Sequence, residues 1–413
     1  MTRLTQQSSM KCQLIVAACV ALVACTERDR DLTITDSSGV RLVTNRAEGE
    51  GWFMTPRMTV TEDLTIGADS LPEYQFGRIG DLDVAQNGDI AVIDQLGGVV
   101  RVYNDSGRYL RSIGRSGQGP GELSRSANGI YFIGGDSLLL LDPGERRKTT
   151  FAANGTVGAV TPLPPGPTGQ GWTRLMSGDF LMRGLTISRV DGKFTFWDAL
   201  LGVRADTAVS DTLFEFDYVK TDMGGPPRIR IQLIVNNPTW ARLSDGRIAW
   251  TALDRNYVQV HDSTGKIVAR ITHAQWVPKE ITPADKAAMV ELLRTKLQAI
   301  GGDASFADSP QVEAPSHFPA ITAVRAGPDG TIWVQQMGPV ESIDPMAINA
   351  PDRADFLGGA TWHVLDSTGR FLGAIELPRR FRIFRVKDRT LYGAARDDNG
   401  VERVLRLRVT TQN

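Results

Sequence analysis

Cysteine is almost missing from this chain of 413 residues. The three that occur, Cys12, Cys19 and Cys25, all lie within the first 25 residues. The rest of the chain therefore offers no thiol for a disulfide, a cysteine nucleophile or a zinc–thiolate site. We expect a folded body that depends on its hydrophobic core alone.

A strong charge excess is missing as well, because 46 Lys and Arg face 47 Asp and Glu and leave a formal net charge of −1. Nucleic-acid-binding domains need a basic excess on one face, so we expect no nucleic-acid partner. The sequence also has no Gly-x-Ser-x-Gly segment, and a serine-hydrolase triad built on that turn is thereby excluded.

The longest apolar run is Leu14–Ala24, which follows the basic residues Arg3 and Lys11. Its length suits a secretory signal and falls short of the ~20 residues of a transmembrane helix. The run ends in Leu22-Val23-Ala24-Cys25, which resembles the lipobox of bacterial lipoproteins.

The lipobox resemblance implies that residues 1–24 are a signal peptide and that Cys25 is lipidated. An ordinary signal peptide with an incidental cysteine is the alternative. Residues 25–31 would be the lipid anchor and a short tether, and the membrane would be a partner through Cys25. Thr26 follows the cysteine, and lipoprotein sorting allows such a protein to reach the outer membrane of a two-membrane cell. We expect the cell envelope, on the periplasmic or the surface side.

Residues 32–413 are built on repeats. Six times a tight turn of Gly, Asn, Asp or Ser precedes an apolar strand, as hairpins require. The first apolar residues of these strands are Ile90, Leu138, Phe180, Ile248, Ile332 and Leu391. In three of the repeats a second turn glycine follows 17 residues later, at Gly107, Gly155 and Gly265. The strand–turn–strand unit between the two turns is therefore one repeated object.

The spacing of the repeats predicts the fold. The first two intervals are 48 and 42 residues, which match the ~40–50 residues of a four-stranded propeller blade. Six starts predict an all-β, six-bladed β-propeller with one inserted helix. An open β-sandwich array and a seven-bladed ring are the alternatives. Leu32–Val40 repeats the second turn alone, and we expect it to close the ring by pairing near Val404–Val409.

Three insertions interrupt the blades, at residues 211–238, within 276–316 and at 338–359. Residues 281–300 predict a helix, because Thr282 and Asp285 fit a capping box around Pro283. We expect the three insertions to cluster at one end of the ring and to form the rim of a ligand site. In the alternative, they point to different ends and only cover strand edges.

Gly107–Leu123 carries a family resemblance. The stretch GRYLRSIGRSGQGPGEL resembles the blade junction of NHL-repeat propellers and of bacterial six-bladed propeller lipoproteins. The resemblance implies a propeller that serves as a recognition platform, although a fold does not determine function. A phosphate-binding loop at Gly114–Gly119 is disfavoured, because such a loop must open a helix and Pro120 follows here.

Some six-bladed propellers are calcium-dependent hydrolases or lyases, which need oxygen ligands converging on the central channel. The fourth residue after each apolar start is acidic only at Asp94 and Asp142. These two residues and Glu122 are weak metal candidates, and a turn-capping role is the favoured interpretation of the aspartates. We expect no cofactor. The four histidines show no metal-ligand spacing.

The function we expect is that of a binding or scaffold module for a protein, peptide or glycan, tethered to the membrane. The alternative is a calcium-dependent hydrolase or lyase of the six-bladed type. No catalytic residue is predicted. Weak candidates for ligand contacts are Arg228, Arg230, His317 and Trp240, because charged and aromatic side chains near turns can orient a partner. Trp250, Trp333 and Trp362 lie in apolar strands and are expected in the core.

Overall fold

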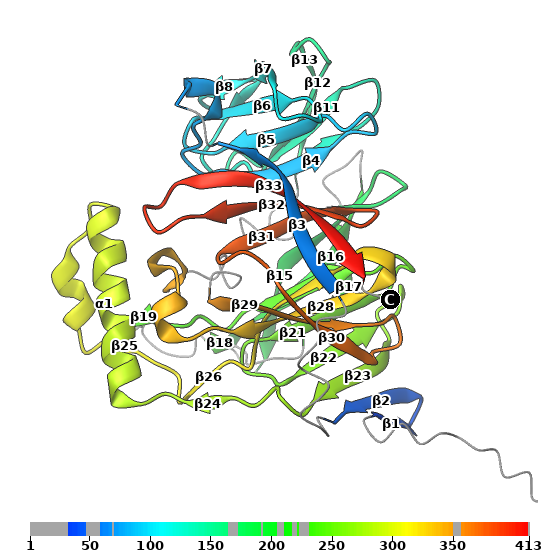
Figure 1. The fold of residues 1–413 in the computed structure, drawn as a ribbon, viewed down its shortest axis with the longest axis vertical. Coiled ribbons are helices and arrows are strands. Elements are labelled where there is room, and N and C mark those ends of the chain that lie inside the picture. Colours follow the sequence, from blue (N-terminus) through cyan, green and yellow to red (C-terminus); the bar gives the residue numbers. More distant parts are fainter. Residues whose placement is uncertain are drawn as a thin grey trace, which may run out of the picture.

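The computed structural model describes residues 32–46, 58–67, 70–163, 172–190, 193–204, 210–216, 221–222, 231–349 and 357–411. The expected signal peptide, Cys25 and the tether lie outside these residues. Within them, six antiparallel sheets follow one another along the chain (Figure 1). The inner strand of the last sheet lies against the inner strand of the first. The sheets therefore form a closed ring of six blades, as the repeats predict.

Each blade runs from an inner to an outer strand. The first three blades are β4 (Ile79–Val84), β5 (Ile90–Asp94), β6 (Val99–Tyr103), β7 (Tyr109–Ile113); β10 (Gly129–Phe132), β11 (Leu138–Asp142), β12 (Arg147–Phe151), β13 (Val157–Pro162); and β14 (Thr173–Arg174), β15 (Phe180–Val190), β16 (Lys193–Val203), β17 (Ser210–Glu215). The short β18 (Thr221–Asp222) also pairs with β16. The predicted apolar starts at Ile90, Leu138 and Phe180 each open the second strand of a blade.

The other three blades follow the same order. They are β20 (Pro238–Arg242), β21 (Ile248–Ala252), β22 (Tyr257–His261), β23 (Ile267–His273); β27 (Ile321–Ala326), β28 (Ile332–Met337), β29 (Gly358–Leu365), β30 (Phe371–Glu376); and β31 (Phe381–Lys387), β32 (Thr390–Arg396), β33 (Glu402–Thr411), β3 (Met58–Ile66). Every residue of the second strands β5 and β21 is buried, because both faces of these strands pack against other side chains. Trp250, Trp333 and Trp362 are core residues, as expected.

The ring is closed by a different strand from the one expected. Residues 58–66, as β3, pair with β33, so that Val60 faces Val409 and Ile66 faces Val404. The pairing site near Val404–Val409 was correct, but the assignment of Leu32–Val40 to it was wrong. The turn at Ser38 and Gly39, with φ of 56° and 79°, folds that segment back on itself instead.

The N-terminal segment forms a hairpin of β1 (Leu32–Ser37) and β2 (Val40–Asn45). β2 runs parallel to β23 and extends the fourth blade to six strands. Asn45 holds it there: its Nδ2 donates to the carbonyls of Thr272 (3.1 Å) and Gly369 (2.9 Å), and its Oδ1 accepts from the Phe371 N–H (2.8 Å). The hairpin is therefore fastened to the fourth and fifth blades together.

Candidate functional site

The two ends of the ring are not equivalent. In an antiparallel blade, the turn between the second and third strands and the link to the next blade lie at one end, and the other two turns lie at the opposite end. The long links from β17 to β20 and from β23 to β27, and the long loop from β28 to β29, all belong to the first group. We call this end of the ring the insertion end.

The three insertions pack into one unit. The helix α1 (Pro283–Ala299) starts with the predicted capping box, in which Thr282 accepts from the Asp285 N–H. In Figure 1, α1, β19 (Ile231–Gln232) and β25 (Val312–Glu313) lie together on the left side of the molecule. β19 and β25 pair in parallel. A shared core draws on all three insertions: Ile231, Leu233, Ile234, Met289, Leu293, Ala307, Val312, Phe318, Ile343, Ala347, Ile348 and Leu357.

The clustering of the insertions at one end is thus confirmed, and their bounds change slightly. The first insertion starts after β17, at residue 216 rather than 211, because residues 211–215 complete the third blade. The third ends at residue 357, because β29 begins at Gly358. Whether this end is the rim of a ligand site stays a prediction.

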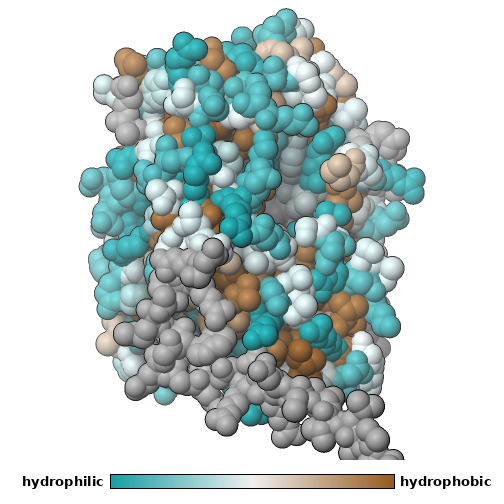
Figure 2. Space-filling view, turned by 45° about the vertical axis from the view of Figure 1, so that its right-hand side comes forward, coloured by the Kyte–Doolittle hydropathy of each residue, from teal (hydrophilic) through white to brown (hydrophobic). Residues whose placement is uncertain are grey.

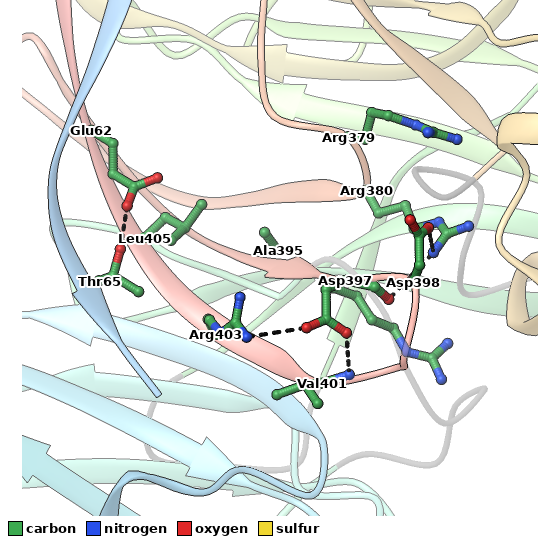
Figure 3. Close-up of a pocket in the computed structure, with 11 residues that line it drawn as sticks. Glu62, Thr65, Arg379, Arg380, Ala395, Asp397, Asp398, Val401, Arg403 and Leu405 are labelled. Atoms are coloured by element: carbon green, nitrogen blue, oxygen red, sulfur yellow. Dashed lines mark hydrogen bonds and ion pairs between the residues drawn. The ribbon is translucent and has the colours of Figure 1, made fainter. Parts of the chain in front are cut away.

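A cleft of about 290 Å³ opens beside the insertions, in the last blade (Figure 3). It lies where β32 turns into β33 and where β30 links to β31, both of which belong to the insertion end. We call it the arginine cleft, because four of its lining side chains are guanidiniums. The lining residues are Glu62, Thr65, Arg379, Arg380, Ala395, Arg396, Asp397, Asp398, Val401, Arg403 and Leu405.

One guanidinium of the arginine cleft ties it to the third insertion. Nη1 of Arg396 donates to both carboxylate oxygens of Asp344, at 2.8 and 2.9 Å. Asp344 is 1% exposed and also accepts from the Met346 N–H, which starts a short 3-10 turn. Because the Asp344 carboxylate is buried, its pairing with Arg396 fixes the insertion against the last blade.

The other three arginines differ in how far they are paired. Arg403 bonds to Asp397 at 3.1 Å, and Arg380 bonds to Asp398 at 3.1 Å. Asp398 is 84% exposed, and ion pairs in water are weak. Arg379 is exposed and forms no hydrogen bond or ion pair with any residue that the structure describes. The cleft therefore contains one uncompensated guanidinium next to a loosely held one.

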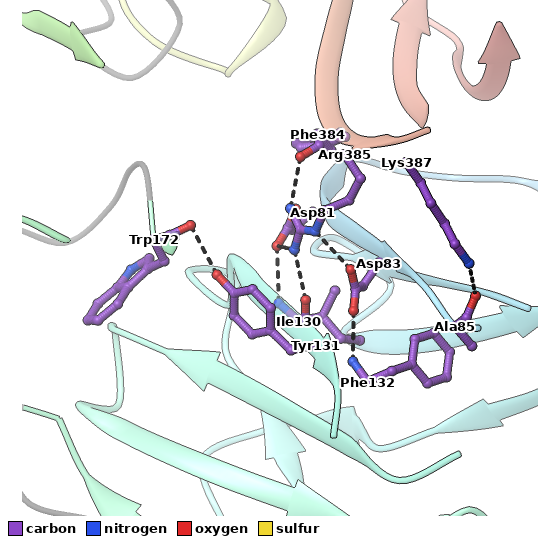
Figure 4. A network of polar contacts seen from close by, with 10 residues as sticks. All are labelled: Asp81, Asp83, Ala85, Ile130, Tyr131, Phe132, Trp172, Phe384, Arg385 and Lys387. Carbon is purple, nitrogen blue, oxygen red and sulfur yellow. Dashed lines mark hydrogen bonds and ion pairs between the residues drawn. The ribbon is translucent and has the colours of Figure 1, made fainter. Parts of the chain in front are cut away.

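Polar side chains also join neighbouring blades at the inner wall of the ring (Figure 4). Arg385, from the last blade, donates to Asp81 (3.0 and 3.1 Å) and Asp83 (2.9 Å) of the first blade. It also donates to the Ile130 carbonyl of the second blade (2.9 Å). Burial raises the pKa of Asp81, although Arg385 opposes that shift. All of these groups are satisfied by one another, so the network joins three blades.

The weak metal candidates prove to be separate and occupied. Asp94 accepts from the N–H groups of Gly77, Arg78 and Gly97 and pairs with Arg101 at 2.8 Å. Such bonds match the turn-capping role favoured for this aspartate. In the part of the chain that the structure describes, no three His, Cys, Asp or Glu side chains come together as a metal site would need.

The other two metal candidates behave similarly. Asp142 accepts from Ser124 N–H (2.9 Å) and hydroxyl (2.5 Å) and from the Glu145 N–H. Glu122 bonds to Arg115 and to the Gly119 N–H, and these bonds hold the pKa of Glu122 below its usual range. No described residue of the Gly114–Gly119 loop opens a helix; β9 (Glu122–Leu123) follows it.

Among the residues predicted to contact a ligand, Trp240 lies in the core rather than at the surface. It is 8% exposed and packs with Trp250 and Phe214 inside the blade stack, so it is not a stacking surface. His317 is exposed in β26 (His317–Phe318) and bonds to Ser316 at the insertion end. Arg228 and Arg230 lie outside the described residues. Sequence reasoning missed the arginine cleft entirely.

Two histidines that showed no spacing pattern meet in the core. The rings of His273 and His363 lie 4.7 Å apart between their centroids, and Trp276 Nε1 donates to Nδ1 of His363 at 3.1 Å. Burial lowers the pKa of His273 to about 4, and burial with the neighbouring His273 lowers that of His363 to about 3. Both imidazoles are therefore neutral at ordinary pH.

Comparison with known proteins agrees with this architecture. A family model described as a 6-bladed beta-propeller matches residues 72–151, which cover the first blade and the first three strands of the second. The chain is a six-bladed β-propeller, mostly β with one α-helix among the residues described. No curated protein matches it. No helix in the described ranges is long and apolar enough to cross a membrane.

Several solved structures are similar at low identity. A candidate exported protein from Bacteroides fragilis is 11% identical, with 90% of this chain and 100% of that chain covered and a TM-score of 0.47. A duf4221 family member from Bacteroides vulgatus is 10% identical, with coverages of 86% and 99% and a TM-score of 0.46. Regucalcin, a calcium-binding protein from Agrobacterium tumefaciens, is 11% identical, with coverages of 86% and 96% and a TM-score of 0.41.

Proposed function

We propose that this protein is a lipid-anchored binding module of the cell envelope, whose propeller takes a protein, peptide or glycan ligand at its insertion end. One observation carries the proposal: three insertions from different blades share a core at the same end of the ring. A loop-built surface held on a rigid scaffold is where propellers and other β-folds commonly bind partners.

The N-terminal hairpin indicates which side of the propeller an anchor would hold. Leu32 pairs with Asn45, and Asn45 donates to the carbonyl of Gly369 in the β29–β30 turn, which belongs to the end opposite the insertions. In Figure 1, β1 and β2 lie at the lower right, whereas α1 lies at the left. Residues 25–31 reach at most ~25 Å when extended. A lipid on Cys25 would therefore hold the hairpin's side of the propeller close to the membrane and leave the insertion end open to a partner.

The surface of the insertion unit has the mixed character of a transient interface. Ile300 is 58% exposed and Phe306 is 42% exposed beside the charged ends of α1. Figure 2 brings the right-hand side of Figure 1 forward and turns the insertion unit away, and on that face hydrophobic residues occur in small groups among hydrophilic ones. Ile300 and Phe306 offer a partner two apolar contacts among polar groups, without a large apolar patch.

The test is capture of a partner from envelope extract by the full chain and by surface variants. Ile300→Glu and Phe306→Glu place charges on the insertion end, and we expect them to lower capture by about tenfold or more. Met176→Glu is the matched control, because Met176 is 100% exposed in the turn between β14 and β15, at the opposite end. Retained proteins and glycans are measured by mass spectrometry.

Capture that survives both insertion-end variants and is lost with Met176→Glu would place the binding surface at the opposite end and refute the proposal. A Cys25→Ser variant tests the anchor in the same preparation. It should accumulate as an uncleaved precursor, whereas a mature-sized soluble product would show that an ordinary signal peptidase cuts the chain.

A further inference from the structure

The chemistry of the arginine cleft points to its ligand. We propose that the cleft binds a carboxylate group that is attached to an apolar group, supplied either by a small organic acid or by the C-terminal end of a peptide. This inference rests on the proposed binding function and names the ligand class that the insertion end recognises.

The guanidiniums of the cleft have more donors than their neighbours can accept. Each guanidinium has five N–H donors in a planar fork that matches a carboxylate. Arg379 uses none of them within the described chain, and Nε of Arg380 is buried without a partner there. Arg380 donates only from Nη1 among the bonds that the structure shows, to Asp398 and to the Asp397 carbonyl. An acceptor-rich ligand supplies what this wall lacks.

The acids of the cleft determine how much negative charge it tolerates. Both oxygens of Asp397 are occupied, one by the N–H groups of Asn399 and Val401 and the other by Arg403. Asp398 remains next to Arg380. Across the cleft, Glu62 accepts from the Thr65 hydroxyl. Counted with Asp344 behind Arg396, four guanidiniums face four carboxylates, and Arg379 is the one without an acid as partner in the described chain. One carboxylate can pair with Arg379, whereas the cleft offers no positive excess to balance the second charge of a phosphate dianion.

The wall away from Arg379 and Arg380 combines three aliphatic side chains, Ala395, Val401 and Leu405, with Glu62 and Thr65, which bond to each other. Ala395 and Leu405 lie between the arginines and Glu62 in Figure 3, and Val401 lies at the turn. Val401 is 42% exposed, while Leu405 is 6% exposed. A fork of guanidiniums on one side and an aliphatic surface on the other matches a carboxylate joined to a short hydrocarbon or to a leucine-like side chain.

Titration calorimetry of the purified full chain tests the inference with matched probes. Hexanoate is compared with hexanamide, which has the same apolar part and no charge, and with inorganic phosphate. A short peptide ending in leucine is compared with its C-terminal amide. We expect hexanoate or the free-acid peptide, or both, to bind at least about tenfold more tightly than the amides and phosphate, because charge-assisted bonds are lost in the amides.

Variants locate the site. Arg379→Gln removes the uncompensated guanidinium without breaking a bond, and it should weaken carboxylate binding about tenfold. Arg108→Gln is the matched control, since Arg108 is also exposed, bonds only through its backbone among the described residues, and does not line the cleft. Arg108→Gln should leave the affinity unchanged.

The outcomes separate this inference from the proposed function. Equal binding of acid and amide, tighter binding of phosphate, or an Arg379→Gln affinity equal to that of the parent chain would overturn the carboxylate assignment. If partner capture still depended on Ile300 and Phe306 in that case, the binding function would stand alone. If a carboxylate bound at Arg379 while partner capture did not depend on Ile300 and Phe306, the carboxylate site would be supported and partner binding at the insertion end would be refuted.

Discussion

Arg385 shows how single side chains hold this ring together. Its guanidinium leaves the last blade and ends among Asp81 and Asp83 of the first blade and a carbonyl of the second. The two carboxylates also accept from N–H groups of β10: Asp81 from Ile130 and Asp83 from Phe132. Because β10 presents these N–H groups at the inner edge of its blade, the carboxylates satisfy donors that no strand covers.

We predict that Arg385→Met destabilises the protein by about 3–5 kcal/mol, because the buried Asp81 and the half-buried Asp83 lose their counter-charge. Urea unfolding followed by tryptophan fluorescence measures the change. Arg389→Met is the control: Arg389 pairs with Asp329, and both side chains are more than half exposed, so its loss should cost ~0–1 kcal/mol. Similar losses for the two variants would contradict a closing role for the Arg385 network.

At the scale of single elements, the hairpin β1–β2 is an addition to the ring rather than a part of a regular blade. Its only buried polar side chain among the described residues is Asn45, which is 2% exposed. The three bonds of Asn45 reach the fourth and fifth blades. The hairpin thus depends on one side chain far more than a strand inside a blade does.

We predict that Asn45→Ala lowers the free energy of unfolding by at least about 2 kcal/mol, because it leaves buried carbonyls and an N–H without partners. Limited proteolysis should also release the hairpin earlier. Thr35→Ala, at an exposed position of β1, is the control and should change neither measurement. A hairpin that stays protected in Asn45→Ala would show that its strand pairing with β23 suffices.

Strands and helices were predictable from the sequence where a turn pattern recurs or where a capping motif marks the start of a helix. The apolar starts at Ile90, Leu138 and Phe180 mark strands because turn glycines precede them, and the capping box of Thr282 and Asp285 located α1 to within about two residues. The closing strand was misassigned because Leu32–Val40 carries the same turn signal as a blade. Strand pairing over long separations is decided by packing in three dimensions, which a turn signal does not reveal.

At the scale of the whole molecule, the order of antiparallel strands determines at which end of the ring each loop lies. The clustering of the three insertions at one end could therefore be predicted once the blades were recognised. The arginine cleft could not. Its side chains come from β3, from the link before β31 and from the β32–β33 turn, with Asp344 of the fifth blade behind them. No motif joins residues so far apart in the chain, and an unpaired arginine looks like any other surface arginine in the sequence.

The stability of the whole fold should depend on pH through its buried histidines. His273 and His363 have folded-state pKa values of about 4 and about 3, below the unfolded value near 6.5. The free energy of unfolding is therefore unaffected by these histidines above about pH 6.5, and it decreases as the pH falls toward their folded-state pKa values. Between about pH 6.5 and 5, each histidine should lower the free energy of unfolding by about 2 kcal/mol, because it binds a proton in the unfolded chain only and each pH unit then counts about 1.4 kcal/mol.

Unfolding free energies measured from neutral pH down to about pH 5 check this expectation. The double variant His273→Gln with His363→Gln keeps an acceptor at both positions and should flatten the pH dependence, whatever its stability at neutral pH. His317→Gln, at an exposed position, should leave the slope of the parent protein. A slope that persists in the double variant would assign the acid sensitivity to other groups.

The pairing of β3 with β33 also determines the order in which this molecule can be completed. Thr59 and Thr410, whose hydroxyls bond at 2.7 Å across the last blade, are 351 residues apart. During synthesis the first partner emerges long before the second, and it has no neighbour until almost the whole chain has been made. The five earlier blades can assemble in turn, but the circle stays open until its final strand arrives. The hairpin before it can already settle on β23 once the fourth blade has been made, but β3 itself waits for β33, and only the last residues of the chain close the circle.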